Sequence, residues 1–230
     1  MQKINLHPSE TIEELGKSHL KIIQDSNTYR FSIDSILLGE FVYTKRNERI
    51  IDLGTGCGII PLMIYDSAKN NNIYAVEIQE KLADIAKRSV ILNNLEKEIN
   101  ILHDDMQNLL NRFPAEFFDV ITSNPPYIPA GKGKVSSKEE QLFARHEINI
   151  NIDNMTAICS RLLKKRGRLF LIHRADSLIQ VIMVLRKYLF EPKVLKFIYT
   201  KKNQNAKRVL IEARKEGGTE LKVAPPLILD

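Results

Sequence analysis

From residue 49 onward, short runs of aliphatic and β-branched residues alternate with longer segments whose apolar residues recur at helical spacing. The short runs predict strands at 49–53, 73–77, 99–102, 118–123, 168–173, 194–199 and 208–213. The longer segments predict helices at 57–70, 79–94, 106–112, 154–165 and 177–190, with Gly167 ending the fourth. Such alternation implies parallel crossovers, so we expect an α/β fold with helices on both faces of a mostly parallel sheet. The last two strands lack an intervening helix and should pair as an antiparallel hairpin.

The composition fits a globular chain without membrane spans. Of the 230 residues, 43% are hydrophobic and 27% are charged, close to the averages for soluble domains. No apolar run approaches the roughly 20 residues that cross a bilayer, and the first residues contain no signal-peptide core. The two cysteines and five histidines show no disulfide framework or metal-ligand spacing. We therefore expect a cytoplasmic, metal-free protein, and the sequence gives no prediction of its oligomeric state.

Charge is unevenly distributed along the chain. Residues 50–159 carry 10 lysines and arginines against 15 acids, whereas residues 160–230 carry 17 against 6, a net charge of +11. A solvated basic surface would account for this excess. A polyanionic partner would account for it too, because neutralised phosphates release their condensed counterions.

A glycine turn follows the first predicted strand of the sheet. Asp52 is the last residue but one of that strand, and Gly54, Gly56 and Gly58 follow at alternate positions before a helix begins. Glycines at such a turn let a ligand approach the backbone, and the helix start offers unpaired N–H groups. The spacing is GxGxG, and Ile59 stands where a dinucleotide-binding turn has its last glycine. The turn therefore predicts a nucleotide-like ligand other than NAD.

Acidic residues end the next two predicted strands. Glu77 lies 23 positions after Gly54, where an acid would bind the two hydroxyls of a ribose, although it could simply cap a helix. Asp104, Asp105 and Met106 end the third strand, at the edge where open α/β sheets bind ligands. Glycines and acids on successive strand ends favour an adenosyl cofactor that carries no phosphates.

The fourth predicted strand runs into Asn124-Pro125-Pro126-Tyr127. Prolines lack N–H donors, so the Asn124 side-chain oxygen and the Pro125 carbonyl form a pair of acceptors suited to an –NH₂ group. Tyr127 offers a flat face on which a planar substrate can stack. A rigid turn would explain two prolines alone, but their place after the glycine and acid series favours an active site.

With these motifs in place, residues 29–213 resemble the class I S-adenosylmethionine-dependent methyltransferases, in particular the amino-methylating group with a (D/N)PP(Y/F) motif. The resemblance implies a Rossmann-like sheet of seven strands in the order 3-2-1-4-5-7-6, with the seventh strand antiparallel. It also implies a single domain, in which residues 1–48 form an appendage that packs on the cofactor site and 49–230 form the methyltransferase domain.

The same resemblance implies a role for each motif residue toward S-adenosyl-L-methionine and the target amine. Asp52 and the glycines Gly54, Gly56 and Gly58 would hold the methionyl part of the cofactor. Glu77 would bind the ribose, and Asp105 with Met106 the adenine. The catalytic residues would be Asn124, which also borders the cofactor, with Pro125 and Tyr127.

Three further segments are similar to bacterial tRNA1(Val) (adenine(37)-N6)-methyltransferases: 29–38, which contains Asp34; 144–147, which contains Arg145; and the basic segment 205–211. The similarity implies that Asp34 lies against the cofactor; Asp34 can also be interpreted as the N-cap of a helix over 35–43. A tRNA partner is implied, with substrate contacts expected from Tyr127, Lys132, Lys134, Arg145, Lys201, Lys202, Lys207 and Arg208.

Other functions remain open at this point. A release-factor glutamine methyltransferase shares the NPPY motif, but that family carries a larger helical domain before the glycine turn. Adenine-N6 methyltransferases of ribosomal RNA or DNA share the chemistry, although the DNA enzymes usually add a recognition domain. An RNA-binding module without activity would explain the basic segment and leave the aligned glycines, Glu77 and Asn124 unexplained.

Overall fold

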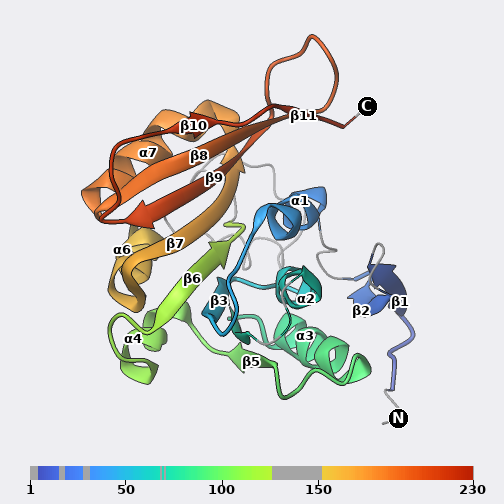
Figure 1. The fold of residues 1–230 in the computed structure, drawn as a ribbon. Helices are drawn as coiled ribbons and strands as arrows, with labels where there is room; N and C mark the ends of the chain where they lie inside the picture. Colours follow the sequence, from blue (N-terminus) through green and yellow to red (C-terminus); the bar gives the residue numbers. More distant parts are fainter. Residues whose placement is uncertain are drawn as a thin grey trace, which may run out of the picture.

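The computed structural model describes residues 5–15, 19–27, 32–67, 69, 71–125 and 152–229. Within these residues, a twisted sheet crosses the molecule and helices cover both of its faces (Figure 1). The strands of this sheet are β3 (Arg49–Leu53), β4 (Asn72–Glu77), β5 (Ile99–His103), β6 (Phe118–Ser123), β7 (Leu163–Arg174), β8 (Phe190–Tyr199), β9 (Arg208–Lys215), β10 (Lys222–Val223) and β11 (Leu227–Ile228).

The strand order confirms the predicted α/β class. The long strands follow one another as β5-β4-β3-β6-β7-β9-β8, which is the expected order 3-2-1-4-5-7-6. Only β9 among them runs antiparallel to its neighbours, and it pairs with both β7 and β8. Two short strands that the sequence did not predict, β10 and β11, extend the sheet by pairing in parallel with β8.

Helices cover both faces of the sheet. Successive strand residues point to opposite faces, so the apolar strands supply a core on each side. Ile50 belongs to the core beneath α1, α2 and α3, whereas Ile51 belongs to the core beneath α4, α6 and α7. The helices are α1 (Ile33–Phe41), α2 (Ile59–Ser67), α3 (Glu80–Leu92), α4 (Leu109–Arg112), α6 (Ile152–Leu162) and α7 (Leu178–Lys187), with 3₁₀ turns η1 (Met106–Asn108) and η2 (Ala175–Ser177). None of the helices in the described ranges could span a membrane.

A small antiparallel hairpin, formed by β1 (Glu10–Leu15) and β2 (Leu20–Asp25), precedes α1. It packs against α3: Ile22 and Ile23 of β2 are fully buried, and the Ile23 N–H donates to Ser89 Oγ at 3.0 Å. The sequence did not predict this hairpin. The domain boundary at residue 48 and the packing of 1–48 on the cofactor site remain predictions.

The prediction that Gly167 ends a helix is wrong. The helix α6 ends at Leu162, and β7 follows at once with a bulge that separates the pairs Phe118–Leu163 and Val120–Arg168. A Cβ on Gly167 would lie 2.6 Å from Leu163 Cγ, so glycine serves the close packing inside this bulge. The left-handed residue is Arg166, with φ of +61°.

Candidate active site

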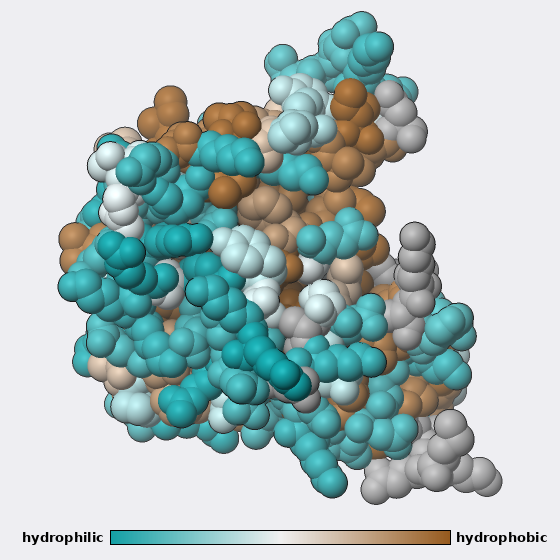
Figure 2. All heavy atoms as spheres, viewed as in Figure 1, coloured by the Kyte–Doolittle hydropathy of each residue, from teal (hydrophilic) through white to brown (hydrophobic). Residues whose placement is uncertain are grey.

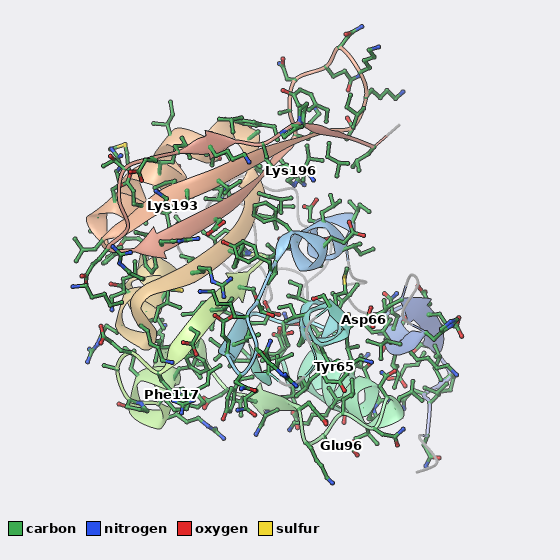
Figure 3. The ribbon with its side chains drawn as sticks, in the orientation of Figure 1. Tyr65, Asp66, Glu96, Phe117, Lys193 and Lys196 are labelled. Atoms are coloured by element: carbon green, nitrogen blue, oxygen red, sulfur yellow. The ribbon has the colours of Figure 1, made fainter. Side chains whose placement is uncertain are left out.

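The predicted motif residues lie at one edge of the sheet, where β3, β4, β5 and β6 end. These strands are parallel, so their carboxyl ends meet at the same edge. Phe117 and Glu96, labelled in Figure 3, precede β6 and β5 and therefore mark the opposite, amino edge. Hydrogen bonds join the strand ends: Gly54 N–H donates to Val76 O at 2.9 Å, and Asp104 N–H to Glu77 O at 3.1 Å.

The turn after β3 depends on glycine at two positions that border open space. Gly54 and Gly56 have φ values of +71° and +58°, in the left-handed region that disfavours a side chain. A Cβ on either would meet no described atom within 4 Å. The backbone therefore faces a space into which a ligand can come close. Gly58 differs, because a Cβ there would lie 3.1 Å from Ala86 Cβ of α3.

Glu77 connects the glycine turn to the start of α3. Its Oε2 accepts the Gly56 N–H at 2.8 Å, and its Oε1 accepts the Gln79 N–H at 3.0 Å. The residue is only 5% exposed, and burial raises the pKa of its carboxyl despite these bonds. Each oxygen keeps a second lone pair, so the carboxylate can accept two hydroxyl groups without losing its backbone partners.

Asp52 is fully buried at the end of β3. It lies opposite Thr122 of β6, whose hydroxyl donates to Asp52 Oδ1 at 2.6 Å. The other oxygen, Oδ2, has no hydrogen-bond partner among the described residues. Burial raises the pKa of Asp52 to about 6, and the nearby Glu77 adds to the rise, while the Thr122 and Thr55 hydroxyls oppose it.

The end of β5 places Asp105 and Met106 beside the same edge. Asp105 caps η1, since its Oδ1 accepts the Gln107 N–H at 2.9 Å. Asp104 Oδ1 stabilises this turn by accepting the Asp105 N–H at 2.8 Å. Met106 is buried in the core. The Asp105 carboxylate thus has a structural task, and its contact with an adenine remains a prediction.

Asn124 directly follows β6, and two serines that the sequence analysis did not identify orient its amide. Its Nδ2 donates to Ser35 Oγ at 2.9 Å and lies 3.5 Å from Ser32 Oγ. An amide whose nitrogen faces these hydroxyls presents its oxygen on the other side, as an acceptor. Pro125 is buried next to it. Both serines lie close to Asp34 in the segment 31–35 (FSIDS). The sequence analysis had already singled out Asp34, so its neighbours were the signal from which the two serines could have been identified.

Asp34 and Arg208, predicted for different ligands, contact each other. Arg208 Nε donates to Asp34 Oδ2 at 2.7 Å, although 174 positions separate the two residues. The N-cap interpretation of Asp34 is wrong, because α1 begins at Ile33 with Ser32 as its N-cap. Arg208 opens β9, and since β9 is antiparallel, its amino end lies at the carboxyl edge of the parallel strands.

The loop between β8 and β9 projects from this edge of the sheet (Figure 1). It carries the predicted RNA contacts Lys201, Lys202 and Lys207, all of which are exposed. The remaining predicted substrate residues lie outside the described residues: they are Tyr127, Lys132, Lys134 and Arg145.

The edge fits a cofactor that carries positive charge. Asp52 and Glu77 are both buried, and burial raises the pKa of each carboxyl even though each accepts hydrogen bonds. The unpartnered Asp52 Oδ2 and the space over Gly54 and Gly56 lie in the same turn. A cationic group bound there would stabilise both carboxylates. No group of three potential metal ligands was found in the described part of the chain.

Comparisons with known sequences identify a family and several similar proteins. Residues 28–194 match the family described as Methyltransferase small domain. A tRNA1(Val) (adenine(37)-N6)-methyltransferase of Aliivibrio salmonicida is 29% identical over 181 residues, which cover 79% of this chain and 75% of that protein. The protein of the same name from Bacteroides thetaiotaomicron is 32% identical over 190 residues, covering 81% of this chain and 77% of that protein.

Solved structures share the fold. A predicted O-methyltransferase from Agrobacterium tumefaciens matches with a TM-score of 0.68 at 23% identity, covering 85% of this chain and 87% of that chain. A SAM-dependent methyltransferase from Aquifex aeolicus matches with a TM-score of 0.56 at 17% identity, covering 80% of this chain and 89% of that chain.

We predict that Asp52→Asn stabilises the protein without ligand at neutral and alkaline pH. The folded pKa of about 6 lies above the ordinary 3.8, so ionisation favours the unfolded chain, and wild-type stability falls as pH rises through this interval. The asparagine does not titrate. The stability of Asp52→Asn relative to wild type should therefore rise by about 3 kcal/mol between about pH 4 and pH 7. Urea unfolding at several pH values measures this difference.

Asp25→Asn provides a control in which the stability difference from wild type should change with pH in the opposite direction. A hydrogen bond from Lys81, whose Nζ lies 2.6 Å from Asp25 Oδ2, lowers the pKa of Asp25 to about 2. This variant should lose stability relative to wild type as pH rises from about 2 to 4. A pH-independent difference for Asp52→Asn would contradict the assignment of a buried, unfavourable charge.

Proposed function

The chain belongs to the methyltransferase small domain family, and we propose that it transfers the methyl group of S-adenosyl-L-methionine to N6 of an adenine in tRNA. The proposed nucleotide is position 37, beside the anticodon of a valine tRNA, as the names of the similar proteins from Aliivibrio and Bacteroides suggest. A tRNA substrate implies that the reaction takes place in the cytoplasm. The cofactor is that of the family, S-adenosyl-L-methionine, which supplies a methyl group on a positively charged sulfur.

The observation that carries the proposal is the placement of Asn124. Its amide is oriented by Ser35 at the strand end next to the buried acids Asp52 and Glu77. An acceptor oxygen for an amine therefore lies at the same edge as the residues suited to the cofactor. The exposed lysines of the β8–β9 loop flank this edge and suit a nucleic acid.

The chain's own residues position the amine for attack. The exocyclic nitrogen of adenine is a weak nucleophile, because its lone pair is delocalised into the ring. Asn124 Oδ1 and the Pro125 carbonyl would each accept one of its N–H groups, which favours a more tetrahedral nitrogen with an available lone pair. Positioning and electrostatic stabilisation supply most of the acceleration. A strong base is not required, since the nitrogen becomes acidic once it is alkylated.

Asp52 and Glu77 would hold the cofactor. Glu77 would accept the two ribose hydroxyls while keeping its bonds to Gly56 and Gln79. Asp52, with an unpartnered buried oxygen, would face the positively charged methionyl part. Asp34 is proposed to border the cofactor while its Oδ2 pairs with Arg208. This pair would link cofactor binding to the base of the β8–β9 loop.

Nucleoside mass spectrometry distinguishes the proposed substrate from its alternatives. Purified protein, S-adenosyl-L-methionine and separate tRNA, ribosomal RNA, DNA and release-factor preparations would be incubated and digested. N6-methyladenosine confined to tRNA, and mapped to position 37 of valine tRNA, is the expected result. A methylated glutamine in the release factor, or methylation of another nucleic acid, would contradict it. A protein that binds tRNA and transfers no methyl group would be a binding module.

Asn124→Ala should lower the rate of methyl transfer by about 10²–10³-fold, the usual cost of removing a contact made in the transition state. Affinity for S-adenosyl-L-methionine, measured by calorimetry, should stay within a few-fold of wild type. Asn124→Asp keeps an acceptor oxygen and should retain more activity than the alanine variant. Wild-type turnover in Asn124→Ala would remove this residue from the catalytic machinery.

Glu77→Gln should act on the cofactor first. The amide can still accept the Gly56 N–H but loses an acceptor oxygen and the negative charge, so affinity for S-adenosyl-L-methionine should fall by about ten- to a hundredfold. Turnover at saturating cofactor should change less. Calorimetry gives the affinity, and thermal unfolding checks that the glycine turn remains intact. A variant with normal affinity and a lowered rate would reverse the assigned roles.

Replacing Lys201, Lys202 and Lys207 together by glutamate should weaken tRNA binding and flatten its salt dependence. A plot of the logarithm of tRNA affinity against the logarithm of salt concentration has a slope of about −0.7 to −0.9 for each phosphate that the protein neutralises. Arg208 is left in place, because it pairs with Asp34. The matched control reverses three exposed lysines elsewhere: Lys69, Lys87 and Lys97. Equal tRNA affinity and equal salt slope in the two triple variants would exclude the loop as an RNA contact.

A further inference from the structure

A second cluster of positive charge lies at the amino edge of the sheet, opposite the active site. There a cavity of about 210 Å³ opens between the segment that joins α1 to β3 and the start of β7. Figure 2 shows hydrophilic side chains across this part of the surface, over the blue segment of Figure 1. Six cationic side chains line the cavity: Lys45, Lys164, Lys165, Arg166, Arg168 and Arg214.

The cations outnumber the carboxylates available to them. Lys45 and Arg166, both exposed, form no ion pair with any residue that the structure describes. Two positive charges in the cavity lining therefore have no ion-pair partner among the described residues. The other four cations are paired, as Lys164–Asp119 at 2.6 Å, Lys165–Glu216 at 2.9 Å, Arg168–Glu48 and Arg214–Glu212 at 3.1 Å.

Both acids that line the cavity are occupied by donors of the chain itself. Glu48 Oε2 accepts the Lys45 N–H at 2.6 Å and the Arg168 guanidinium. Asp119 accepts Lys164 Nζ through Oδ1 and the Arg49 N–H, at 2.9 Å, through Oδ2. These carboxylates therefore hold the cations in place and oppose an incoming anion less than free acids would.

Arg168 forms a rigid floor for the cavity. The residue is 5% exposed; its Nη1 donates to Tyr43 O at 2.7 Å, and its guanidinium lies 4.7 Å from the Tyr43 ring centre. It also lies directly opposite Arg214 in the β7–β9 pair. Like charges at opposed positions destabilise a sheet, and here Glu48 and Glu212 pair with the two arginines.

The bulge in β7 directs three consecutive cations toward the cavity. Residues Lys164–Gly167 are extra residues opposite Asp119 of β6, which lets the bulge project from the sheet. Arg166 at its tip has φ of +61°, a conformation that is unfavourable for arginine. Bulges of this kind re-aim side chains beside functional sites.

From the excess of two charges, the buried arginine and the projecting bulge, we propose that this cavity binds a phosphate group. A phosphate offers up to two negative charges and several acceptor oxygens, which match the charges and N–H donors of the unpaired Lys45 and Arg166 in the cavity lining. Its source is either a phosphodiester of the RNA substrate or a free phosphate compound. The RNA source rests on the proposed function.

The distance between the two edges suits a single RNA molecule. The six residues of β6 separate them by about 20 Å, at about 3.3 Å per residue. A folded RNA whose target base lies at Asn124 can therefore place a backbone phosphate in the cavity.

The test uses the double variant Lys45→Gln/Arg166→Gln, which removes the two unpaired charges from exposed positions and should leave the core intact. Its matched control is Lys87→Gln/Lys97→Gln, two exposed lysines on α3 and in the loop after it. Binding of inorganic phosphate is measured by calorimetry. Binding of tRNA is measured by fluorescence anisotropy across a salt series, and binding of S-adenosyl-L-methionine serves as the folding control.

We expect the cavity variant to bind phosphate at least about tenfold more weakly than the parent and the control, with cofactor affinity unchanged. If tRNA affinity also falls, and the slope of its logarithm against the logarithm of salt concentration becomes smaller in magnitude by about 0.7 to 0.9, the source is an RNA phosphodiester. If tRNA affinity is unchanged, the source is a free phosphate compound. Equal behaviour of the cavity variant and the control toward both phosphate and tRNA would overturn the proposal. Absence of tRNA methylation by the parent protein would instead reject the proposed function and leave the phosphate result standing.

Discussion

The buried carboxylate of Asp52 is the constraint on which the active-site edge depends. It lies at the end of the central strand β3, with no exposure to solvent and with only one oxygen bonded, to Thr122. Burial in this setting disfavours the charged form, and Glu77 beside it increases the disadvantage. The folded protein therefore carries an unfavourable electrostatic arrangement, which a positively charged cofactor would relieve. The glycine turn keeps the backbone beside Asp52 open for that cofactor.

The charge asymmetry of the chain follows the division of the sheet. Residues 50–159, which are net acidic, supply β3 to β6 and the acids of the cofactor edge. Residues 160–230, with a net charge of +11, supply β7 to β11, the β8–β9 loop and most of the amino-edge cations. The boundary between β6 and β7 thus separates a half suited to a cationic cofactor from a half suited to a polyanion. Asn124 lies at this boundary, where the two substrates would meet.

Sequence reasoning succeeded where the determining signal was local. The glycine turn, Glu77 and Asn124 each follow a run of β-branched residues, so the strand ends could be located, and parallel crossovers then bring them to one edge. Contacts between distant segments were not predictable: Asn124 meets Ser35 across 89 positions, and Arg208 meets Asp34 across 174. The β1–β2 hairpin was missed because charged residues interrupt its apolar pattern. Gly167 was wrongly predicted to end a helix, because glycine is also favoured where a bulge packs closely.

The position of β9 has a consequence for how the chain folds. It follows β8 in the sequence but lies between β7 and β8 in the sheet, antiparallel to both. During synthesis, β7 therefore emerges with one long edge of unpaired N–H and C=O groups, which stays open until residues 208–215 leave the ribosome. Pairings of this kind form slowly, and open edges are prone to intermolecular association. The half of the sheet that carries the basic surface is consequently the half that depends on the last long strand, and a nascent chain stalled before β9 would expose its β7 edge to aggregation.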